Sequence, residues 1–295
     1  ENILSDVKIL RKPEFETVRY NTKLSFIPSE RNLVSVIRNI DQSYRSAESD
    51  VLFNYIFEWG EAKDSYTAEH PKRLSFTDNI EYINDGGNDL VRLINENKMI
   101  PAYYASSGVQ SAMPLDVMAD YFTGLVGKNA SVSKHDLANT LARYLGKDKE
   151  LTNEMLKSIS NKMKYQSVQL FIEEPEQNLY PDSQRNLTIN LVCALKQAMP
   201  KGRGDSMLVM TTHSPYILST LNVLIAEAYA MDAKPKSDKL RNIVNKECLF
   251  PLSAYSAYYI QEDGKFADII DKDITMISGN ELDGVSDWVD DKIAR

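Results

Sequence analysis

The stretch from Leu170 to Pro181 reads LFIEEPEQNLYP, and the rest of the chain is best interpreted outward from it. Val168 to Ile172 is a short apolar run of strand length, and its nearly unbroken apolar character predicts a strand that is covered on both faces. Two carboxylates, Glu173 and Glu174, follow this run immediately before Pro175. Because α/β sheets place their ligands beyond the carboxyl ends of their strands, the acid pair is a candidate site.

Helix and strand patterns alternate after the acid pair. We expect a helix with regularly spaced leucines, capped by Asp182, and then a second buried strand from Met207 to Met210. Ser214-Pro215 predicts the start of another helix, because proline suits the first helical position. A strand, helix, strand, helix order predicts a mainly parallel sheet flanked by helices, and so an α/β fold.

Elsewhere, apolar periodicity and turn residues predict shorter elements. In chain order we expect a buried strand at 24–27, a helix at 31–46, two strands within 90–104 joined at 96–97, a helix after 108 to about 122, helices at 133–146 and 153–164, and a β-hairpin at 255–270. Residues 44–84 are mixed in composition, and we interpret them as a helical insertion. No apolar run reaches the ~20 residues that a membrane span needs.

The composition is that of an ordinary globular protein, with 43% hydrophobic and 26% charged residues among 295. The net charge of −8 argues against a broad electrostatic hold on nucleic acid, although a local patch or a partner could still provide one. Cys193 and Cys248 are too few for a disulfide framework and lack the spacing of a zinc site. With no secretory leader pattern, we expect a cytoplasmic protein with no membrane partner.

The acid pair can be interpreted as a catalytic site or as an ordinary surface turn. One carboxylate of such a pair can hold Mg²⁺ while the other orients a water nucleophile. The alternative is a solvated acidic turn, which commonly follows a strand. The apolar run before Glu173 and Glu174, and the Pro-Glu sequence after them, favour the chemical interpretation.

Two further segments contain candidate residues. His213 stands among hydroxyl residues just past the strand at 207–210, where it can donate a hydrogen bond to a phosphate or to attacking water. Its alternative role is that of a structural histidine at a helix start. Residues 105–110 read ASSGVQ, and small residues that open a helix expose N–H groups to an anion. For that segment an ordinary N-cap is the simpler alternative.

These three features occur in a fixed order, at spacings of about 65 and about 40 residues. Together they resemble the ABC ATPase superfamily. More closely, they look like its soluble bacterial branch of predicted ATP-binding proteins, which is related to chromosome-maintenance and recombination ATPases and to the ATPase modules of overcoming-lysogenisation-defect nucleases. Besides LFIEEPEQNLYP, the resemblance rests on FIPSERN (26–32), ASSGVQSAMPL (105–115), VMTTHSPYILSTLN (209–222) and ISGNELDGVSDWV (277–289).

The resemblance implies ATP and Mg²⁺ as cofactors and gives each candidate a role. Glu173 takes the Walker B role towards the metal, Glu174 that of the catalytic base, and His213 that of the H-loop histidine. Residues 177–180 fall at the D-loop, and 29–31 lie near the Q-loop without a secure alignment. The signature loop, which in the family contacts the γ-phosphate bound by the opposite subunit, is matched by Ser106, Ser107 and Gly108.

One motif of the family does not occur in this sequence. A P-loop needs GxxxxGK[ST], and the nearest string, GLVGKN at 124–129, is too short and lacks the hydroxyl. In the family this loop precedes the signature by well over a hundred residues, so we expect it before Glu1 or in a second chain. The expected partner is a second copy or an N-terminal P-loop-bearing segment, and the chain alone should be inactive.

These expectations divide the chain into four parts. They are the end of the N-terminal ATPase lobe (1–43), the helical insertion (44–84), a signature-bearing helical lobe (85–165), and the Walker B and H-loop lobe with a C-terminal hairpin (166–295). We expect Ser106 to lie far from Glu174 on a separate lobe, because the signature serves the partner's nucleotide.

Three function classes remain to be compared. The leading hypothesis is the C-terminal portion of an ATPase that hydrolyses ATP at a dimer interface to drive a conformational switch, with DNA metabolism or phage defence suggested by the resemblance. The second is a degenerate ATPase-like domain that acts as a protein-interaction module. The third is a nuclease, for which a solvated hairpin is the simpler interpretation of the acids. Its metal cluster would be Glu262, Asp263, Asp268, Asp271 and Asp273.

Overall fold

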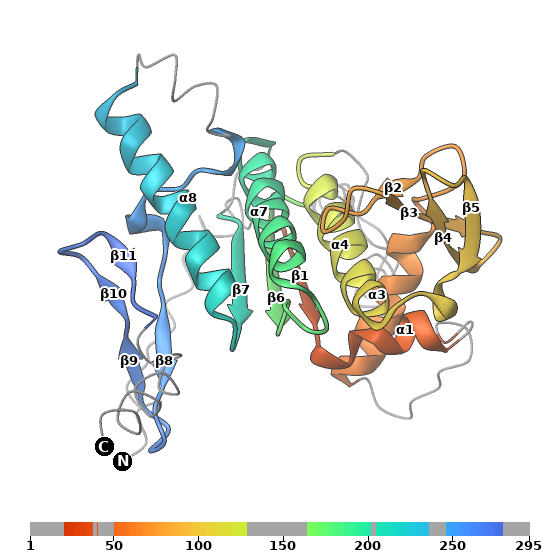
Figure 1. Cartoon of the computed structure of the whole chain (residues 1–295), viewed down its shortest axis with the longest axis horizontal. Coiled ribbons are helices and arrows are strands. Elements are labelled where there is room, and N and C mark those ends of the chain that lie inside the picture. Colours follow the sequence, from red (N-terminus) through yellow and green to blue (C-terminus); the bar gives the residue numbers. More distant parts are fainter. Residues whose placement is uncertain are drawn as a thin grey trace, which may run out of the picture.

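The computed structural model describes residues 21–37, 40, 50–128, 164–201, 205–235 and 246–279. Its elements form three neighbouring groups, which are a central parallel sheet with its helices, an antiparallel sheet, and a C-terminal helix with hairpins (Figure 1). The helices expected to begin at residues 133 and 153 lie outside the described residues. Among the described residues, no helix combines the length and the apolar character that crossing a bilayer requires.

The central sheet has three parallel strands in the order β1-β6-β7. Their bounds, with those of the helices that follow β6 and β7, are β1 (Thr22–Ile27), β6 (Ser167–Glu173), α7 (Pro181–Ala198), β7 (Met207–Thr211) and α8 (Pro215–Ala233). This order confirms the predicted α/β fold with a parallel sheet. Helix α7 differs in one detail, because Tyr180 is its N-cap and Asp182 lies in the first turn, where a carboxylate favours the helix dipole.

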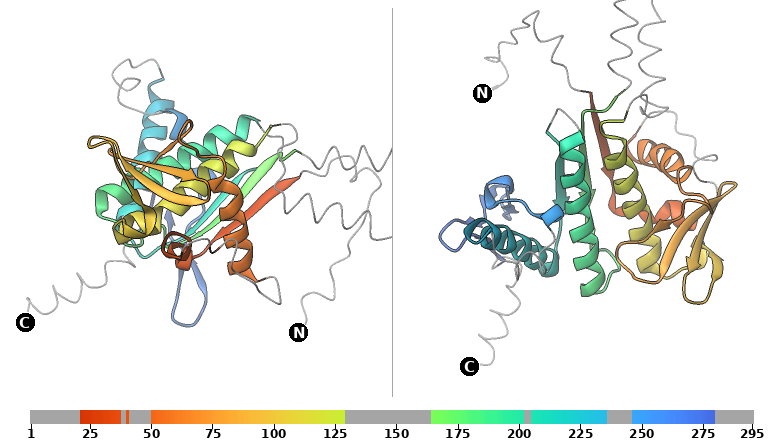
Figure 2. Two further views of the ribbon diagram at one scale, coloured as in Figure 1. Left: turned by 90° about the vertical axis from the view of Figure 1, so that its right-hand side faces the viewer. Right: turned by 90° about the horizontal axis from the view of Figure 1, so that it is seen from above.

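The two faces of this sheet are covered unequally. Leu170 and Ile172 point into a core shared with helices α4 (Ser107–Leu125) and α7, and each is 2% exposed. The alternate residues are open, since Leu24 is 58% exposed and Met207 is 40% exposed. Figure 2 shows α4 and α7 together on one side of the strands. The predicted burial of both faces is therefore wrong for the described part of the chain, because its helices cover only one face.

Helix α4 lies within the main hydrophobic core and has no core of its own. Its Met113 and Phe122 are fully buried in the cluster that also contains Leu170 of β6 and Leu187 of α7. Helix α3 (Val51–Lys63) adds the buried Trp59 to the same cluster. The sheet, α4 and α7 therefore share one hydrophobic core.

A four-stranded antiparallel sheet covers the far side of α3 and α4 (Figure 1). It consists of β2 (Lys72–Arg73), β3 (Ile80–Asp85), β4 (Asn88–Leu93) and β5 (Lys98–Pro101). The predicted strand pair within 90–104 is confirmed, with Asn97 in a left-handed turn at φ 48°. The sheet also begins earlier than expected, so residues 44–84 contain α3 and two strand segments, and a boundary at 84 falls inside β3.

The helix predicted at 31–46 is interrupted near its start, and residues 38–39 and 41–49 lie outside the described residues. A 3₁₀ turn, η3 (Ser29–Asn32), leads into α1 (Leu33–Val36), and Ile37 is extended with φ −98° and ψ 117°. Periodicity alone did not show that Arg31 turns inward and is fully buried.

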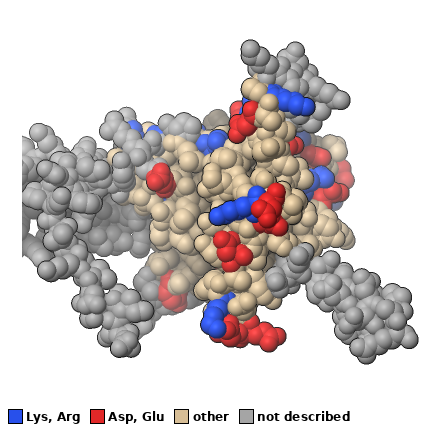
Figure 3. Space-filling model, turned by 90° about the vertical axis from the view of Figure 1, so that its left-hand side faces the viewer, with Lys and Arg blue, Asp and Glu red and all other residues tan. Residues whose placement is uncertain are grey.

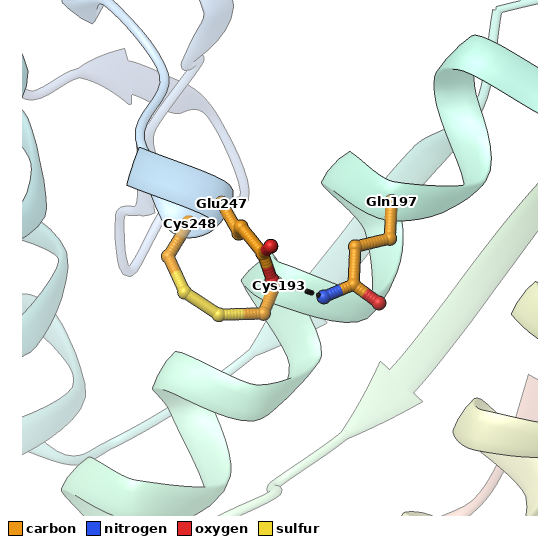
Figure 4. The surroundings of a disulfide bond; sticks show 4 residues. All are labelled: Cys193, Gln197, Glu247 and Cys248. Carbon is orange, nitrogen blue, oxygen red and sulfur yellow. Dashed lines mark hydrogen bonds between the residues drawn. A yellow bond between two sulfur atoms is a disulfide. The ribbon is translucent and has the colours of Figure 1, made fainter. Parts of the chain in front are cut away.

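The C-terminal part is joined to the central sheet by a disulfide between Cys193 of α7 and Cys248 (Figure 4). Next to it, Gln197 Nε2 donates a hydrogen bond to Glu247 Oε2 at 2.8 Å. The predicted terminal hairpin is confirmed, and a second small hairpin follows it. The remaining elements are η4 (Ala102–Tyr104), η5 (Met199–Lys201), η6 (Lys246–Cys248), η7 (Leu252–Ala254), β8 (Tyr258–Ile260), β9 (Phe266–Asp268), β10 (Ile270–Asp271) and β11 (Met276–Ile277).

Candidate functional site

Three of the predicted site residues meet at the carboxyl ends of two neighbouring strands. Glu173 ends β6 and pairs with Thr211, which ends β7. The Nε2 atom of His213 lies 3.9 Å from the Oε1 atom of Glu174. The two side chains are 85% and 41% exposed, so a phosphate group and water can reach them. This is the edge of a parallel sheet at which α/β proteins bind their ligands.

The backbone turns sharply at Glu174. This residue has φ 43°, in the left-handed region that residues with a Cβ rarely occupy. Its N–H donates to the carbonyl oxygen of Thr211 at 2.9 Å, and Pro175 follows at once. The Glu173 carboxylate is held separately, because the backbone N–H of Ser29 donates to its Oε2 atom at 3.1 Å. The two acids are thus positioned by different neighbours.

Arg31 lies directly behind the acid pair. Its guanidinium donates to the carbonyl oxygens of Glu173 at 2.6 Å and Glu174 at 2.7 Å. Burial lowers the pKa of Arg31 from its ordinary value, while Tyr55 and then Glu176, Glu174 and Glu173 act in the opposite direction. A guanidinium remains charged under these conditions, because its ordinary pKa lies far above neutrality.

The loop that contains His213 is fixed at two points. The backbone N–H of His213 donates to Glu176 Oε1 at 2.7 Å. One residue later, Ser214 Oγ donates to Gln184 Oε1 at 2.5 Å and accepts from Tyr216 N–H at 3.2 Å as the N-cap of α8. The other carboxylate oxygen of Glu176 is buried without a hydrogen-bond partner in the described part of the chain.

The candidate signature residues lie at the start of α4. Ser106 is the N-cap, and its Oγ accepts from the Val109 N–H at 3.5 Å, which is the capping role named as the alternative. Gly108 packs so closely on the loop after the acids that an added Cβ would lie 2.8 Å from the Asn178 carbonyl oxygen. Asn178 Nδ2 also donates to Ser111 Oγ at 2.8 Å.

Ser107 is the first residue of α4, so the three candidate signature residues stand together at its start. Of the three, Gly108 packs against Asn178 in the segment predicted as the D-loop. Among the described contacts, no hydrogen bond joins Ser106 to Glu174. Gly108, two residues after Ser106, packs against Asn178 of the loop that follows the acid pair.

The acid pair suits Mg²⁺, because this ion is usually held by one or two carboxylates together with water and phosphate oxygens. Glu173 keeps acceptor capacity after accepting from Ser29, since a carboxylate has about four acceptor positions. The described residues contain no group of three or more His, Cys, Asp or Glu side chains arranged to bind a metal. The hairpin acids considered for a nuclease therefore do not form such a cluster.

Surface charge on the side of α8 and the C-terminal hairpins is mixed. Acidic and basic side chains are scattered over an otherwise uncharged surface, and the Lys and Arg drawn there form no continuous patch (Figure 3). The described residues of this face therefore form no basic patch of the kind that binds nucleic acid.

Two residues of the site were missed by sequence reasoning. Arg31 was noted only as part of a segment near an insecurely placed Q-loop, and Glu176 only as part of a motif. The signal that could have identified Glu176 is its place two residues after the acid pair, on the same turn. For Arg31 the available signal is a basic residue four positions after the predicted strand at 24–27, which Pro28 terminates.

Comparison with known proteins identifies the family of this chain. Residues 15–218 match the family model described as an AAA ATPase domain, and the match includes the acid pair and His213. Searches of curated proteins and of solved structures gave no match. Because the family model covers well over half of the sequence, the chain belongs to the AAA ATPase domain family, whose class of chemistry is ATP hydrolysis on a P-loop ATPase fold.

Proposed function

We propose that this chain provides the hydrolytic half of an ABC-type ATP site, which acts at a dimer interface to drive a conformational switch. The observation that carries the proposal is the meeting of Glu174 and His213, 3.9 Å apart, at the carboxyl ends of β6 and β7. A general base and a hydrogen-bond donor placed together at this sheet edge suit attack of water on a phosphate.

Each residue has a role that its surroundings support. Glu174 accepts the proton of the attacking water and orients it, and its exposed carboxylate is open to solvent. His213 donates a hydrogen bond to the γ-phosphate or to that water, and Glu176 holds its backbone in place. Glu173 would hold Mg²⁺, which neutralises phosphate charge when it is bound.

The phosphate cradle of the site is proposed to come from a P-loop outside this sequence, either on a preceding segment or on another chain. The sequence contains no GxxxxGK[ST] pattern. The open face of the parallel sheet supports the idea of an added segment, because Leu24, Met207 and Val209 are 37% to 58% exposed there. Parallel sheets are ordinarily covered on both faces.

The start of α4 is proposed to face the ATP of a second subunit. Ser106, Ser107 and Gly108 open this helix and present N–H groups at its positive end. Gly108 packs against the Asn178 carbonyl group and Ser111 accepts from Asn178 Nδ2, which supports a shared surface of the predicted signature and D-loop segments that serves a partner's nucleotide. A role in DNA metabolism or phage defence rests on the resemblance to recombination and anti-phage ATPases alone.

Sedimentation velocity on the P-loop-bearing protein tests this proposal. Glu174→Gln keeps the shape of the side chain but removes the base, so ATP should persist and hold two subunits together. The variant should sediment as a dimer with ATP and as a monomer without it. Adding Ser106→Arg should abolish the dimer, while Asp182→Asn, an exposed carboxylate in the first turn of α7, should leave it intact.

The same experiment separates the alternative. An interaction module without nucleotide chemistry would give the same sedimentation with and without ATP in every variant. That result would overturn the proposal.

A further inference from the structure

Arg31 is a fully buried cation whose role the proposed chemistry does not explain. A guanidinium has five N–H donors in a rigid planar fork. Four hydrogen bonds from this side chain reach the protein, and all four end on backbone carbonyl oxygens. Among the described residues Arg31 forms no ion pair, so its hydrogen bonds act on the backbone and hold it in place.

The four carbonyl groups belong to three separate segments. Two are the carbonyls of Glu173 and Glu174, at the end of β6. The Nε atom donates to Ser111, in the second turn of α4, at 2.8 Å. The fourth bond reaches Pro28 at 3.2 Å, just before η3. One side chain therefore joins the acid pair to the helix that carries the candidate signature residues.

The contact with Glu174 matters because of the backbone conformation there. A residue with a Cβ keeps a left-handed φ, here 43°, only where its surroundings determine it. The Glu174 N–H donates to the Thr211 carbonyl oxygen, and Arg31 donates to the Glu174 carbonyl oxygen. The peptide groups on both sides of Glu174 are therefore fixed. Pro175 supplies no N–H that could hold the turn from the other side.

We propose that Arg31 is a positioning residue that holds the turn at Glu174 and ties it to α4 at Ser111, so that the acid pair and the signature end of α4 move as one unit. A second link, from Asn178 to Ser111, runs parallel to it. The kinetic consequence rests on the proposed function, whereas the structural link does not. Lysine cannot replace Arg31, because an ammonium group is a point charge and cannot bridge carbonyls on three segments.

The structural link is tested on the 295-residue chain without nucleotide. Native-state hydrogen exchange of the wild type should show one shared opening free energy for residues 106–112 and 173–179. In Arg31→Lys both segments should exchange faster, while the β8–β9 hairpin should exchange as in the wild type. Opening of the two segments at clearly different free energies in the wild type, a measurement that needs no variant, would overturn the link.

The kinetic consequence is tested on the P-loop-bearing protein. Arg31→Lys should lower kcat for ATP hydrolysis by about 10²-fold, the cost of a small misplacement of a catalytic group, with KM little changed. Arg31→Ala should regain part of its rate with millimolar guanidinium and none with methylammonium, because only the planar cation restores the fork. Lys23→Met removes another buried cation, which lies on β1 and pairs with Glu58 of α3, and should keep the wild-type kcat.

The two arms fail in distinguishable ways. If the wild type hydrolyses no ATP, the proposed function is wrong, and the exchange experiment alone decides the role of Arg31. If the wild type hydrolyses ATP and Arg31→Lys has its full kcat, Arg31 is not a positioning residue and the proposed function stands.

Discussion

The backbone N–H of His213 donates a hydrogen bond to Glu176 Oε1 across 2.7 Å, which joins the loop after β7 to the loop after β6. The two loops therefore share one support, although 37 positions separate these residues. Glu176 acts on the backbone of His213 and leaves the imidazole free to face a phosphate. Its carboxylate is also one of the charges that oppose the effect of burial on the pKa of Arg31.

Replacing Glu176 should separate the effect of its hydrogen bond to His213 from the effect of its charge. Glu176→Ala removes the acceptor, so the His213 loop should lose about 1 kcal/mol of local support and ATP turnover should fall by roughly 10-fold to 10²-fold. Glu176→Gln keeps an acceptor oxygen and should remain close to the wild-type rate. Steady-state turnover of both variants in the P-loop-bearing protein is the measurement. A glutamine variant as slow as the alanine variant would mean that the charge matters and the hydrogen bond does not.

Two glycines of α4 offer a matched pair for testing its contact with the loop after the acids. A Cβ at Gly108 would lie 2.8 Å from the Asn178 carbonyl oxygen, whereas at Gly124 the nearest atom is the side-chain Nζ of Lys128 at 3.9 Å. Gly108→Ala should lower the free energy of unfolding by about 1–3 kcal/mol through overpacking. Gly124→Ala should raise it by about 0.5–1 kcal/mol, the ordinary gain for a helix. Urea unfolding measures both, and a stabilising Gly108→Ala would show that α4 is not held against this loop.

A buried carboxylate links α4 to its neighbours on both sides. Asp116 accepts from the Ser75 N–H at 2.5 Å and from Asn190 Nδ2 at 3.0 Å, and Lys72 Nζ lies 3.7 Å away. Burial raises the pKa of Asp116 above its ordinary value of 3.8, and Lys72 and Ser75 only partly oppose this.

Since the folded state binds this proton more tightly than the unfolded state, the free energy of unfolding should fall as pH rises from about 4 through the raised pKa. Each unit by which the pKa is raised corresponds to about 1.4 kcal/mol. The Asp116→Asn variant should lack this fall. Urea unfolding of both proteins from pH 4 to pH 8 measures the difference, and parallel pH profiles would contradict the account.

Much of the fold followed from local pattern. The strands β6 and β7, the start of α8 at Ser214-Pro215, and the terminal hairpin were predicted because each is specified by residues close together in the chain. The meeting of Glu174 and His213 followed as well, since parallel neighbouring strands bring their carboxyl ends to one edge.

What could not be predicted depends on partners far away in the sequence. Arg31 is buried because its carbonyl partners come from positions 80 and 142 residues further along, and hydrophobic patterning treats an arginine as a surface residue. The Cys193–Cys248 disulfide spans 55 positions and likewise leaves no local trace. The shared core of α4 and β6 arises from tertiary packing, which no local pattern specifies.

The most direct test of the central claim is the single-turnover rate of ATP hydrolysis by Glu174→Gln in the P-loop-bearing protein, with ATP affinity measured on the same sample. Loss of a positioned base should lower the rate by about 10²–10⁴-fold. ATP affinity should stay near that of the wild type, because the phosphate and metal contacts are made by other groups. Hydrolysis by Glu174→Gln at the wild-type rate under saturating ATP would contradict the assignment of Glu174 as the base and the hydrolytic site built around it.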